Sequence, residues 1–317
     1  MFLRHLFTQR SQRCFVGCTR SLSTQMCSHA HNHKHPPHDD TSAPSSSSSR
    51  SGVSFYGRSL PSTLIPFSST KGKQLFREAL AAGTMESYFP LSEQFTTQSE
   101  PSFCALSSLA MVLNALKYDP KKIWKGVWRW VTEETLQCET STACGHSLDN
   151  IRSKGMVFYD FEALAKCHNV NIQSYPVDDK CLEGCHSYQY DHFRKLVIAS
   201  SSSENAQAFI VCNFSRKYLG QTGDGHFSPL GGIHTGENLV LIMDVARFKY
   251  PPYWVPLSEL YEAMMCRDKV VNEPRGYFVI HSHEIDLSTS ALDKFTTCGM
   301  GSCSESKNSS SRCSAGS

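Results

Sequence analysis

Apolar residues recur every three or four positions along several stretches of the first half of the chain, which is the spacing of a helix with one buried face. Gly83 ends the first stretch, Pro120 follows the second, and Asp160 can cap the fourth. The apolar positions of the four predicted helices are Leu75, Phe76, Ala79 and Leu80; Ala105, Leu109, Val112, Leu113 and Leu116; Trp124, Val127, Trp128 and Val131; and Phe161, Leu164 and Ala165.

The second half of the chain has a different pattern. Short runs of β-branched and aromatic residues at 208–214, 239–243 and 277–280 are separated by Gly, Pro and Asn, and they predict strands. One further helix is predicted between the last two runs, with Leu257, Leu260, Tyr261 and Met264 on its apolar face. Helices followed by strands, without βαβ alternation, predict an α+β fold in which an N-terminal helical part packs on an antiparallel sheet.

The two ends of the chain lack apolar periodicity. We therefore expect a disordered extension over 1–53, one folded unit over 54–287 and a Cys/Ser-rich tail over 288–317. The first 38 residues contain four arginines among apolar residues and serines, and no Asp or Glu. This composition is typical of a mitochondrial transit peptide, so a mitochondrial location is predicted, with a cytoplasmic protein as the alternative.

Composition narrows the classes of function. A net charge of +2 over 317 residues gives no reason to expect a nucleic-acid partner. The chain has no apolar run of about eighteen residues, so no membrane-spanning helix and no membrane partner are expected. Fourteen cysteines and a histidine-rich stretch at His29–His38 leave a metal-sequestering protein as an alternative of a different class. The cysteines, however, are scattered through a patterned core.

Cys104 is the candidate nucleophile, because it opens the predicted helix over 104–117. Unpaired backbone N–H groups and the positive end of the helix dipole stabilise a thiolate at such a position. They can lower the pKa of a cysteine from about 8.5 to about 3.5–7.5. A small buried structural thiol is the simpler interpretation of the position taken alone.

Three other residues complete a candidate active site. Gln98 precedes Cys104 by six residues, so a loop can bring its amide N–H to an oxyanion hole. His226 follows a Gly-bearing turn, and Asp244 ends an apolar strand, where an unpaired carboxylate is costly. A contact between them would orient His226 as base and then acid. Each residue alone is more often structural, but the order Cys, His, Asp along the chain is that of papain-like enzymes.

Long motifs surround these residues: QSEPSFC at 98–104, VLNAL at 112–116, WKGVWRW at 124–130, GHFSPLGG at 225–232 and DVARFKYPP at 244–252. With these motifs the chain closely resembles phytochelatin synthases over about 55–283. The resemblance implies a papain-like fold with Cys104, His226 and Asp244 as a catalytic triad and Gln98 at the oxyanion hole.

The resemblance also implies a reaction. Glutathione loses its glycine to form a γ-glutamylcysteinyl acyl-enzyme, and a second glutathione or a phytochelatin accepts that unit. Arg247 matches the family's position for donor recognition, and Arg216 and Lys249 match positions associated with the acceptor in plant members. No organic cofactor is expected. Cadmium, zinc or copper ions enter chiefly as metal–glutathione thiolates, since thiolates favour soft ions, and the role is heavy-metal detoxification. A homodimer is one possible assembly.

Two points stay open at this stage. The same triad could pass the acyl group to water, which would make the chain a hydrolase that degrades glutathione to γ-glutamylcysteine. No resident metal ligand is singled out either. His29–His38 and Cys181–His186 are candidates for direct metal binding, although solvated segments are the simpler interpretation.

Overall fold

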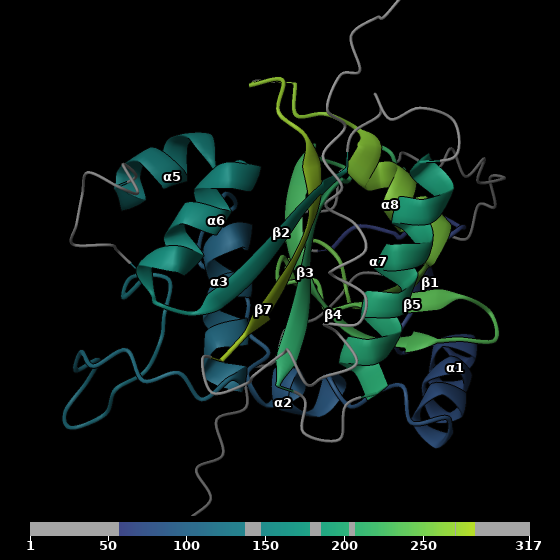
Figure 1. Ribbon diagram of the computed structural model, residues 1–317, viewed down its shortest axis with the longest axis horizontal. Coiled ribbons are helices and arrows are strands. Elements are labelled where there is room, and N and C mark those ends of the chain that lie inside the picture. Colours follow the sequence, from purple (N-terminus) through teal and green to yellow (C-terminus); the bar gives the residue numbers. More distant parts are fainter. Residues whose placement is uncertain (1–56, 137–146, 178–184, 203–206, 270, 283–317) are drawn as a thin grey trace, which may run out of the picture. The chain divides into compact units, whose positions relative to one another are not determined.

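A seven-stranded antiparallel sheet organises the structure, with its strands in the order β1-β6-β5-β4-β3-β7-β2 (Figure 1). The computed structural model describes residues 57–136, 147–177, 185–202, 207–269 and 271–282, so the predicted extension and tail lie outside it. The mixed α+β class and the antiparallel sheet are confirmed. The strands are β1 (Ile65–Pro66), β2 (Asn171–Val177), β3 (Ala208–Ser215), β4 (Gly225–His234), β5 (Leu239–Ile242), β6 (Tyr253–Pro256) and β7 (Arg275–His281).

Helices cover both faces of this sheet. Side chains alternate along a strand, so Phe209 and Val211 of β3 pack with α3 and α6, whereas Ile210 and Cys212 pack with α7 and α8. Figure 1 shows these two groups of helices on opposite sides of the sheet. No helix in the described residues is both long and apolar enough to cross a membrane. The helices are α1 (Thr70–Ala81), α2 (Tyr88–Glu93), α3 (Cys104–Ala115), α5 (Leu148–Lys154), α6 (Phe158–Cys167), α7 (Cys185–Ser202) and α8 (Leu257–Met265).

Most of the predicted helices are confirmed with small shifts. α1 ends just before Gly83, whose φ of 70° is the left-handed conformation that commonly follows a helix. α3 begins at Cys104, as predicted, and α8 carries the predicted apolar face. α6 begins before Asp160, which instead caps the helix from its third position by accepting the Val157 N–H at 3.2 Å.

The predicted helix over 124–131 is wrong. The segment instead forms a tight hairpin, in which the Trp128 N–H donates to the Lys125 carbonyl at 2.9 Å and the Trp124 N–H donates to the Trp128 carbonyl at 2.8 Å. Gly126 has a φ of 57°, which a right-handed helix does not allow. Every residue from 121 to 130 is exposed, so the apolar spacing here does not mark a buried face.

The sheet brings distant residues together at one end of β4 and β5. Leu230 lies opposite Ile242, and the Met243 N–H donates to the Pro229 carbonyl at 3.0 Å. Because of this pairing, Asp244 lies alongside the first part of β4. α3 packs on the same strand, with the Ser108 hydroxyl donating to the Phe227 carbonyl at 3.1 Å. The start of α3, the start of β4 and the end of β5 therefore converge.

Candidate active site

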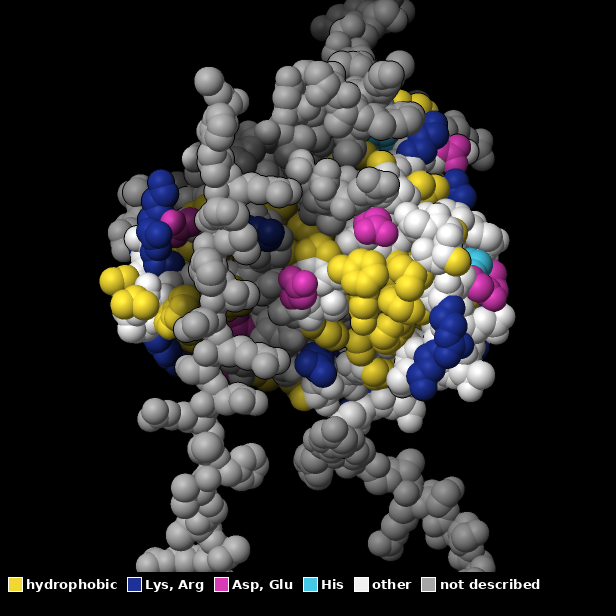
Figure 2. All heavy atoms as spheres, turned by 90° about the horizontal axis from the view of Figure 1, so that it is seen from below, with side chains coloured by type: hydrophobic (Ala, Val, Ile, Leu, Met, Phe, Trp, Pro, Cys, Tyr) yellow, Lys and Arg dark blue, Asp and Glu magenta, His cyan; other side chains and the backbone are white. Residues whose placement is uncertain are grey.

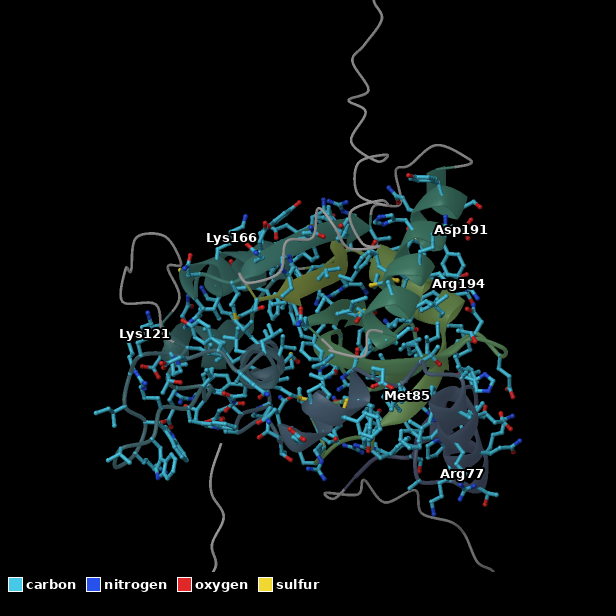
Figure 3. All side chains as sticks on the ribbon, turned by 60° about the horizontal axis from the view of Figure 1, so that its bottom comes forward. Arg77, Met85, Lys121, Lys166, Asp191 and Arg194 are labelled. Atoms are coloured by element: carbon cyan, nitrogen blue, oxygen red, sulfur yellow. The ribbon has the colours of Figure 1, made fainter. Side chains whose placement is uncertain are left out.

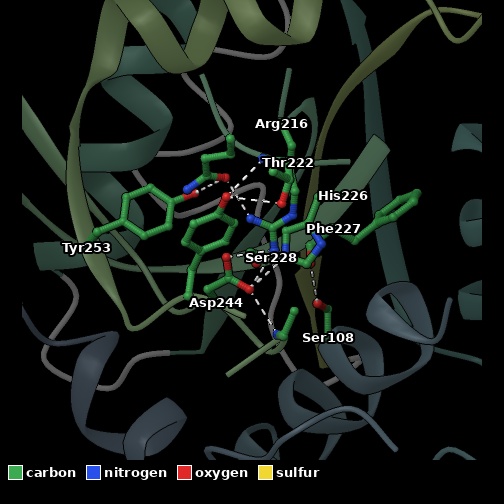
Figure 4. Close-up of polar contacts among 11 residues, drawn as sticks. Ser108, Arg216, Thr222, His226, Phe227, Ser228, Asp244 and Tyr253 are labelled. Carbon is green, nitrogen blue, oxygen red and sulfur yellow. Dashed lines mark hydrogen bonds and ion pairs between the residues drawn. The ribbon is translucent and has the colours of Figure 1, made fainter. Parts of the chain in front are cut away.

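His226 and Asp244 meet at this end of the sheet. His226 Nε2 lies 3.0 Å from Asp244 Oδ1, and the side chains are 4% and 0% exposed (Figure 4). The Ser228 Oγ lies 2.9 Å from the same ring nitrogen. The structure thus joins the two residues that the sequence paired, and it adds a serine that the sequence reasoning missed.

Arg216 holds the carboxylate of Asp244 from the other side (Figure 4). Its Nη2 lies 2.8 Å from each of the two oxygens of Asp244, and its Nη1 donates to Gln221 Oε1 at 2.6 Å. The guanidinium also lies 5.2 Å from the centre of the Tyr250 ring. Its side chain is only 3% exposed. The Ala246 N–H donates to Asp244 Oδ1 at 2.9 Å, so the carboxylate is held in one orientation.

Burial and the charge of Arg216 keep the ring of His226 neutral. Burial raises the pKa of Asp244, but the attraction of His226 and Arg216 outweighs burial and holds that pKa well below its ordinary value. An ionised carboxylate only accepts hydrogen bonds, so Nε2 of His226 carries the ring proton. Burial, followed by the positive charge of Arg216, lowers the pKa of His226 to about 4. At neutral pH its Nδ1 is therefore unprotonated, as a general base requires.

Cys104 is the first residue of α3 and is partly buried. Burial raises the pKa of its thiol, although the backbone N–H groups of Phe227 and Ala105 and the charge of Arg216 act in the opposite direction. The lowered pKa that its place at a helix start predicts is therefore not found. The contact with Phe227 places the thiol beside the residue that follows His226. The two backbone N–H groups would stabilise a thiolate at this position.

Gln98 lies in the loop that leads into α3 and is buried. Its backbone N–H donates to the Val245 carbonyl at 3.0 Å, which ties this loop to the residue after Asp244. Its side-chain nitrogen donates to the Glu100 carbonyl at 2.7 Å, while its side-chain oxygen has no hydrogen-bond partner in the described part of the chain. The loop that leads to Cys104 is thus tied to the residue after Asp244; the oxyanion role of Gln98 stays a prediction.

Two of the predicted substrate-binding residues follow Asp244. Arg247 is exposed, with its guanidinium 4.8 Å from the centre of the Phe95 ring. Lys249 is half-buried, and burial together with the positive charge of Arg216 lowers its pKa. A Cβ placed on Gly223 would lie 3.0 Å from its Nζ, so the amine rests against the turn that leads into β4. Lys249 thus lies close enough to Arg216, Asp244 and Cys104 to interact with their charges, whereas Arg247 follows Asp244 on the exposed surface.

The position of Arg216 differs from that of these two residues. Acceptor binding was predicted for it, yet both its terminal nitrogens already contact buried groups. An acceptor carboxylate could reach this guanidinium only if its contacts with Asp244 and Gln221 opened. The acceptor role of Arg216 stays a prediction, and its contact with Asp244 suggests a different one.

One cluster in the described residues has the composition of a metal site. Glu78, His234 and Glu237 place one ligand atom each within 4.8 Å of one another. Their contacts argue against a metal: His234 Nδ1 accepts the Glu237 N–H at 3.0 Å, and Lys71 pairs with the Glu237 carboxylate. A histidine that ligates through Nε2 normally donates from Nδ1. His29–His38 and the side chains of Cys181–His186 lie outside the described residues.

A cysteine at a helix start, beside a buried histidine and carboxylate, is the constellation of enzymes that form covalent acyl intermediates on sulfur. The phytochelatin synthase family model matches residues 55–277, and the chain belongs to this family. It is 44% identical to the glutathione gamma-glutamylcysteinyltransferase of Schizosaccharomyces pombe over 245 residues, which is 77% of this chain and 55% of that protein.

Two plant relatives with the same enzyme name are similarly close in sequence. The chain is 45% identical to glutathione gamma-glutamylcysteinyltransferase 1 of Lotus japonicus, over 71% of this chain and 42% of that protein. It is 44% identical to the Arabidopsis thaliana protein of the same name, over 72% of this chain and 44% of that protein. The chain thus spans about half the length of the curated relatives it matches.

Proposed function

We propose that this chain removes glycine from glutathione and transfers the γ-glutamylcysteinyl unit to another glutathione or to a growing phytochelatin. The observation that carries the proposal is the buried network of His226, Asp244 and Arg216 beside the Cys104 thiol, in a chain of this family. The names of its relatives support the substrate. The papain-like form of the α+β fold belongs to the same proposal.

The first half of the reaction follows from the protonation states. The sulfur of Cys104 attacks the carbonyl carbon of the cysteinyl–glycine amide while His226 Nδ1 takes the thiol proton. A carbon–sulfur bond forms, the carbon–nitrogen bond breaks, and His226 gives its proton to the departing glycine amine. Gln98 and a backbone N–H at the start of α3 would stabilise the oxyanion. Arg247 would bind a carboxylate of the donor.

In the second half, the α-amine of the acceptor attacks the thioester. It loses a proton to His226, and the proton returns to the Cys104 sulfur as the thioester breaks. Lys249 would hold a carboxylate of the acceptor and so favour the amine over water. Arg216 supports this step from behind the triad: its contact with Asp244 keeps the carboxylate ionised and oriented.

Soft metal ions enter this proposal as part of the substrate. Cadmium, zinc or copper binds the thiol of glutathione, and the resulting thiolate complex is the species acted on. The thiol-rich products then chelate the same ions. No organic cofactor is needed for this chemistry, because the nucleophile, the base and the oxyanion donors are side chains and backbone groups.

The location and assembly belong to the proposal as well. Arginines without acids in the first 38 residues support import into mitochondria, with the cytoplasm as the alternative. Fusion of residues 1–53 to a fluorescent reporter tests this, and a reporter that stays in the cytosol would refute it. A homodimer is also proposed, and light scattering on the purified chain tests it.

Product analysis tests the function itself. The purified chain is incubated with glutathione, with and without cadmium, and the products are weighed by mass spectrometry. Oligomers of γ-glutamylcysteine that end in glycine are the expected result. γ-Glutamylcysteine alone would make the chain a hydrolase. Metal binding that survives Cys104→Ser, in a wild type without turnover, would instead favour a metal-sequestering protein.

A further inference from the structure

The hairpin at 121–130 is a part of the molecule that the proposed reaction does not use. Its base is firmly attached: Asn114 of α3 donates from its side chain to the Val131 carbonyl at 2.9 Å and accepts the Val131 N–H at 3.2 Å. Arg129 pairs with Asp119 at 3.1 Å across the same base. From there the segment extends away from the sheet at the lower left of Figure 1. The base of this hairpin is thus tied to α3 and to Asp119.

The hairpin exposes large apolar side chains to water. Val127 is 82% exposed, Trp128 71% and Ile123 70%, and the two further tryptophans, Trp124 and Trp130, are about 40% exposed. Exposed apolar residues that occur singly are ordinary, but five of them within the eight residues 123–130 indicate an interaction surface. Burial cannot explain the tryptophans, because their hairpin is not covered by any described element.

Charge narrows the choice of partner. Lys121, Lys122, Lys125 and Arg129 lie among these apolar residues, and the stretch 120–132 contains no Asp or Glu. At the left edge of the space-filling view, hydrophobic and basic side chains lie together with an acidic one (Figure 2). Tryptophan favours the boundary between lipid headgroups and acyl chains, and lysine and arginine favour anionic headgroups.

We propose that the hairpin at 121–130 is an anchor that attaches the protein to an anionic lipid surface. Val127 and Trp128 at the tip enter the headgroup layer, while Lys121 and Lys125 contact the lipid phosphates and carboxylates. The lack of a spanning helix in the described residues is compatible with this, because attachment to a surface requires no span. A lipid surface fits better than a second copy of the chain, since two such hairpins would bring eight positive charges together.

Vesicle binding tests this anchor. The full chain is mixed with vesicles of phosphatidylcholine alone or of phosphatidylcholine with phosphatidylserine, and sedimentation and tryptophan emission are followed. Three of the four tryptophans lie in the hairpin, and the fourth, Trp254, is fully buried. Anionic vesicles should therefore shift the emission to shorter wavelength, and high salt should weaken the binding. Neutral vesicles should bind much less.

Paired variants locate the binding. Val127→Ser/Trp128→Ser should remove most of the emission shift, and Lys121→Glu/Lys125→Glu should weaken binding to anionic vesicles by more than about tenfold. Lys73→Glu/Arg77→Glu makes the same charge change on α1, at the other side of the molecule from Lys121, and should bind like the wild type (Figure 3). Glycine release should be unchanged in each variant.

Three results would overturn the anchor. The first is a wild type that does not bind anionic vesicles. The second is equal loss of binding in the α1 control, or none in the hairpin variants, which would assign the binding to general charge or to the arginine-bearing N-terminal segment. The third is a dimer that dissociates in Val127→Ser/Trp128→Ser without any vesicle binding, which would make the hairpin an interface between two copies.

Discussion

Replacing Arg216 with Met separates the two roles that this residue can have. Methionine is unbranched and apolar, so it fills much of the same buried space without the charge. If Arg216 positions Asp244, the variant should form the acyl-enzyme slowly, and glycine release and oligomer formation should fall together. If it binds the acceptor, glycine release should persist and free γ-glutamylcysteine should accumulate.

The size of the effect follows from the contacts. Loss of a charge-assisted hydrogen bond of this kind typically costs about 1.5–3 kcal/mol, so glycine release should fall roughly ten- to a hundredfold. The side chains of Arg216 and Asp244 are 3% and 0% exposed, so solvent screens this ion pair little. Breaking one partner of a buried ion pair costs about 3–5 kcal/mol, and the free energy of unfolding should fall by that order. Urea unfolding measures this.

The pH profile of glycine release provides a readout that lost stability alone would not move. In the proposed mechanism neutral His226 is the working form, so activity should be lost as the pH falls through its pKa of about 4. The charge of Arg216 lowers this pKa, so Arg216→Met should move the acidic limb to higher pH. Arg216→Lys keeps the charge and serves as the control, with a smaller shift. Unchanged glycine release and an unchanged acidic limb would refute the positioning role.

Other residues of the site lead to further predictions. Ser228→Ala removes an acceptor of the His226 ring proton and should slow glycine release about two- to tenfold; an unchanged rate would mean that Asp244 alone orients the ring. Asp244→Asn leaves a buried guanidinium without its counter-charge and should lower the free energy of unfolding by about 3–5 kcal/mol, measured in urea; a wild-type midpoint contradicts this. Arg247→Ala should lower glycine release and oligomer formation together. Lys249→Ala should mainly shift the product ratio from oligomer to γ-glutamylcysteine. Identical product patterns in the two variants would show that Arg247 does not serve the donor and Lys249 the acceptor.

The sequence predicted those elements in which local pattern and burial agree. α3 and β3 are mostly apolar and are buried along nearly their whole length. The hairpin at 121–130 has helical spacing of apolar residues but no buried face, so periodicity alone gave the wrong prediction of a helix. α7 is rich in polar residues, and among its described residues the buried apolar side chains are Phe193, Leu196 and Val197, so its sequence shows little helical periodicity. β4 contains glycines and a proline and is a strand because its neighbours pair with it on both sides.

The residues of the candidate site also differ in whether a local sequence pattern indicates them. Cys104, His226 and Asp244 each have a local signal, namely a helix start, a glycine-bearing turn and a strand end. Ser228 could have been found, because residues two apart on a strand face the same side. The contact between Arg216 and Asp244 could not, since it depends on the order of β3, β4 and β5 in the sheet. The raised pKa of the Cys104 thiol likewise reflects tertiary burial, which its position in the sequence does not reveal.

The covalent intermediate is the most direct test of the account. The protein is mixed with glutathione and cadmium, quenched in acid and digested, and the peptide that contains Cys104 is weighed. The account predicts a γ-glutamylcysteinyl thioester on that peptide, formed together with one free glycine for each site. Cys104→Ser should show neither the adduct nor glycine release. Continued glycine release by Cys104→Ser, or an adduct on another cysteine, would contradict the central claim.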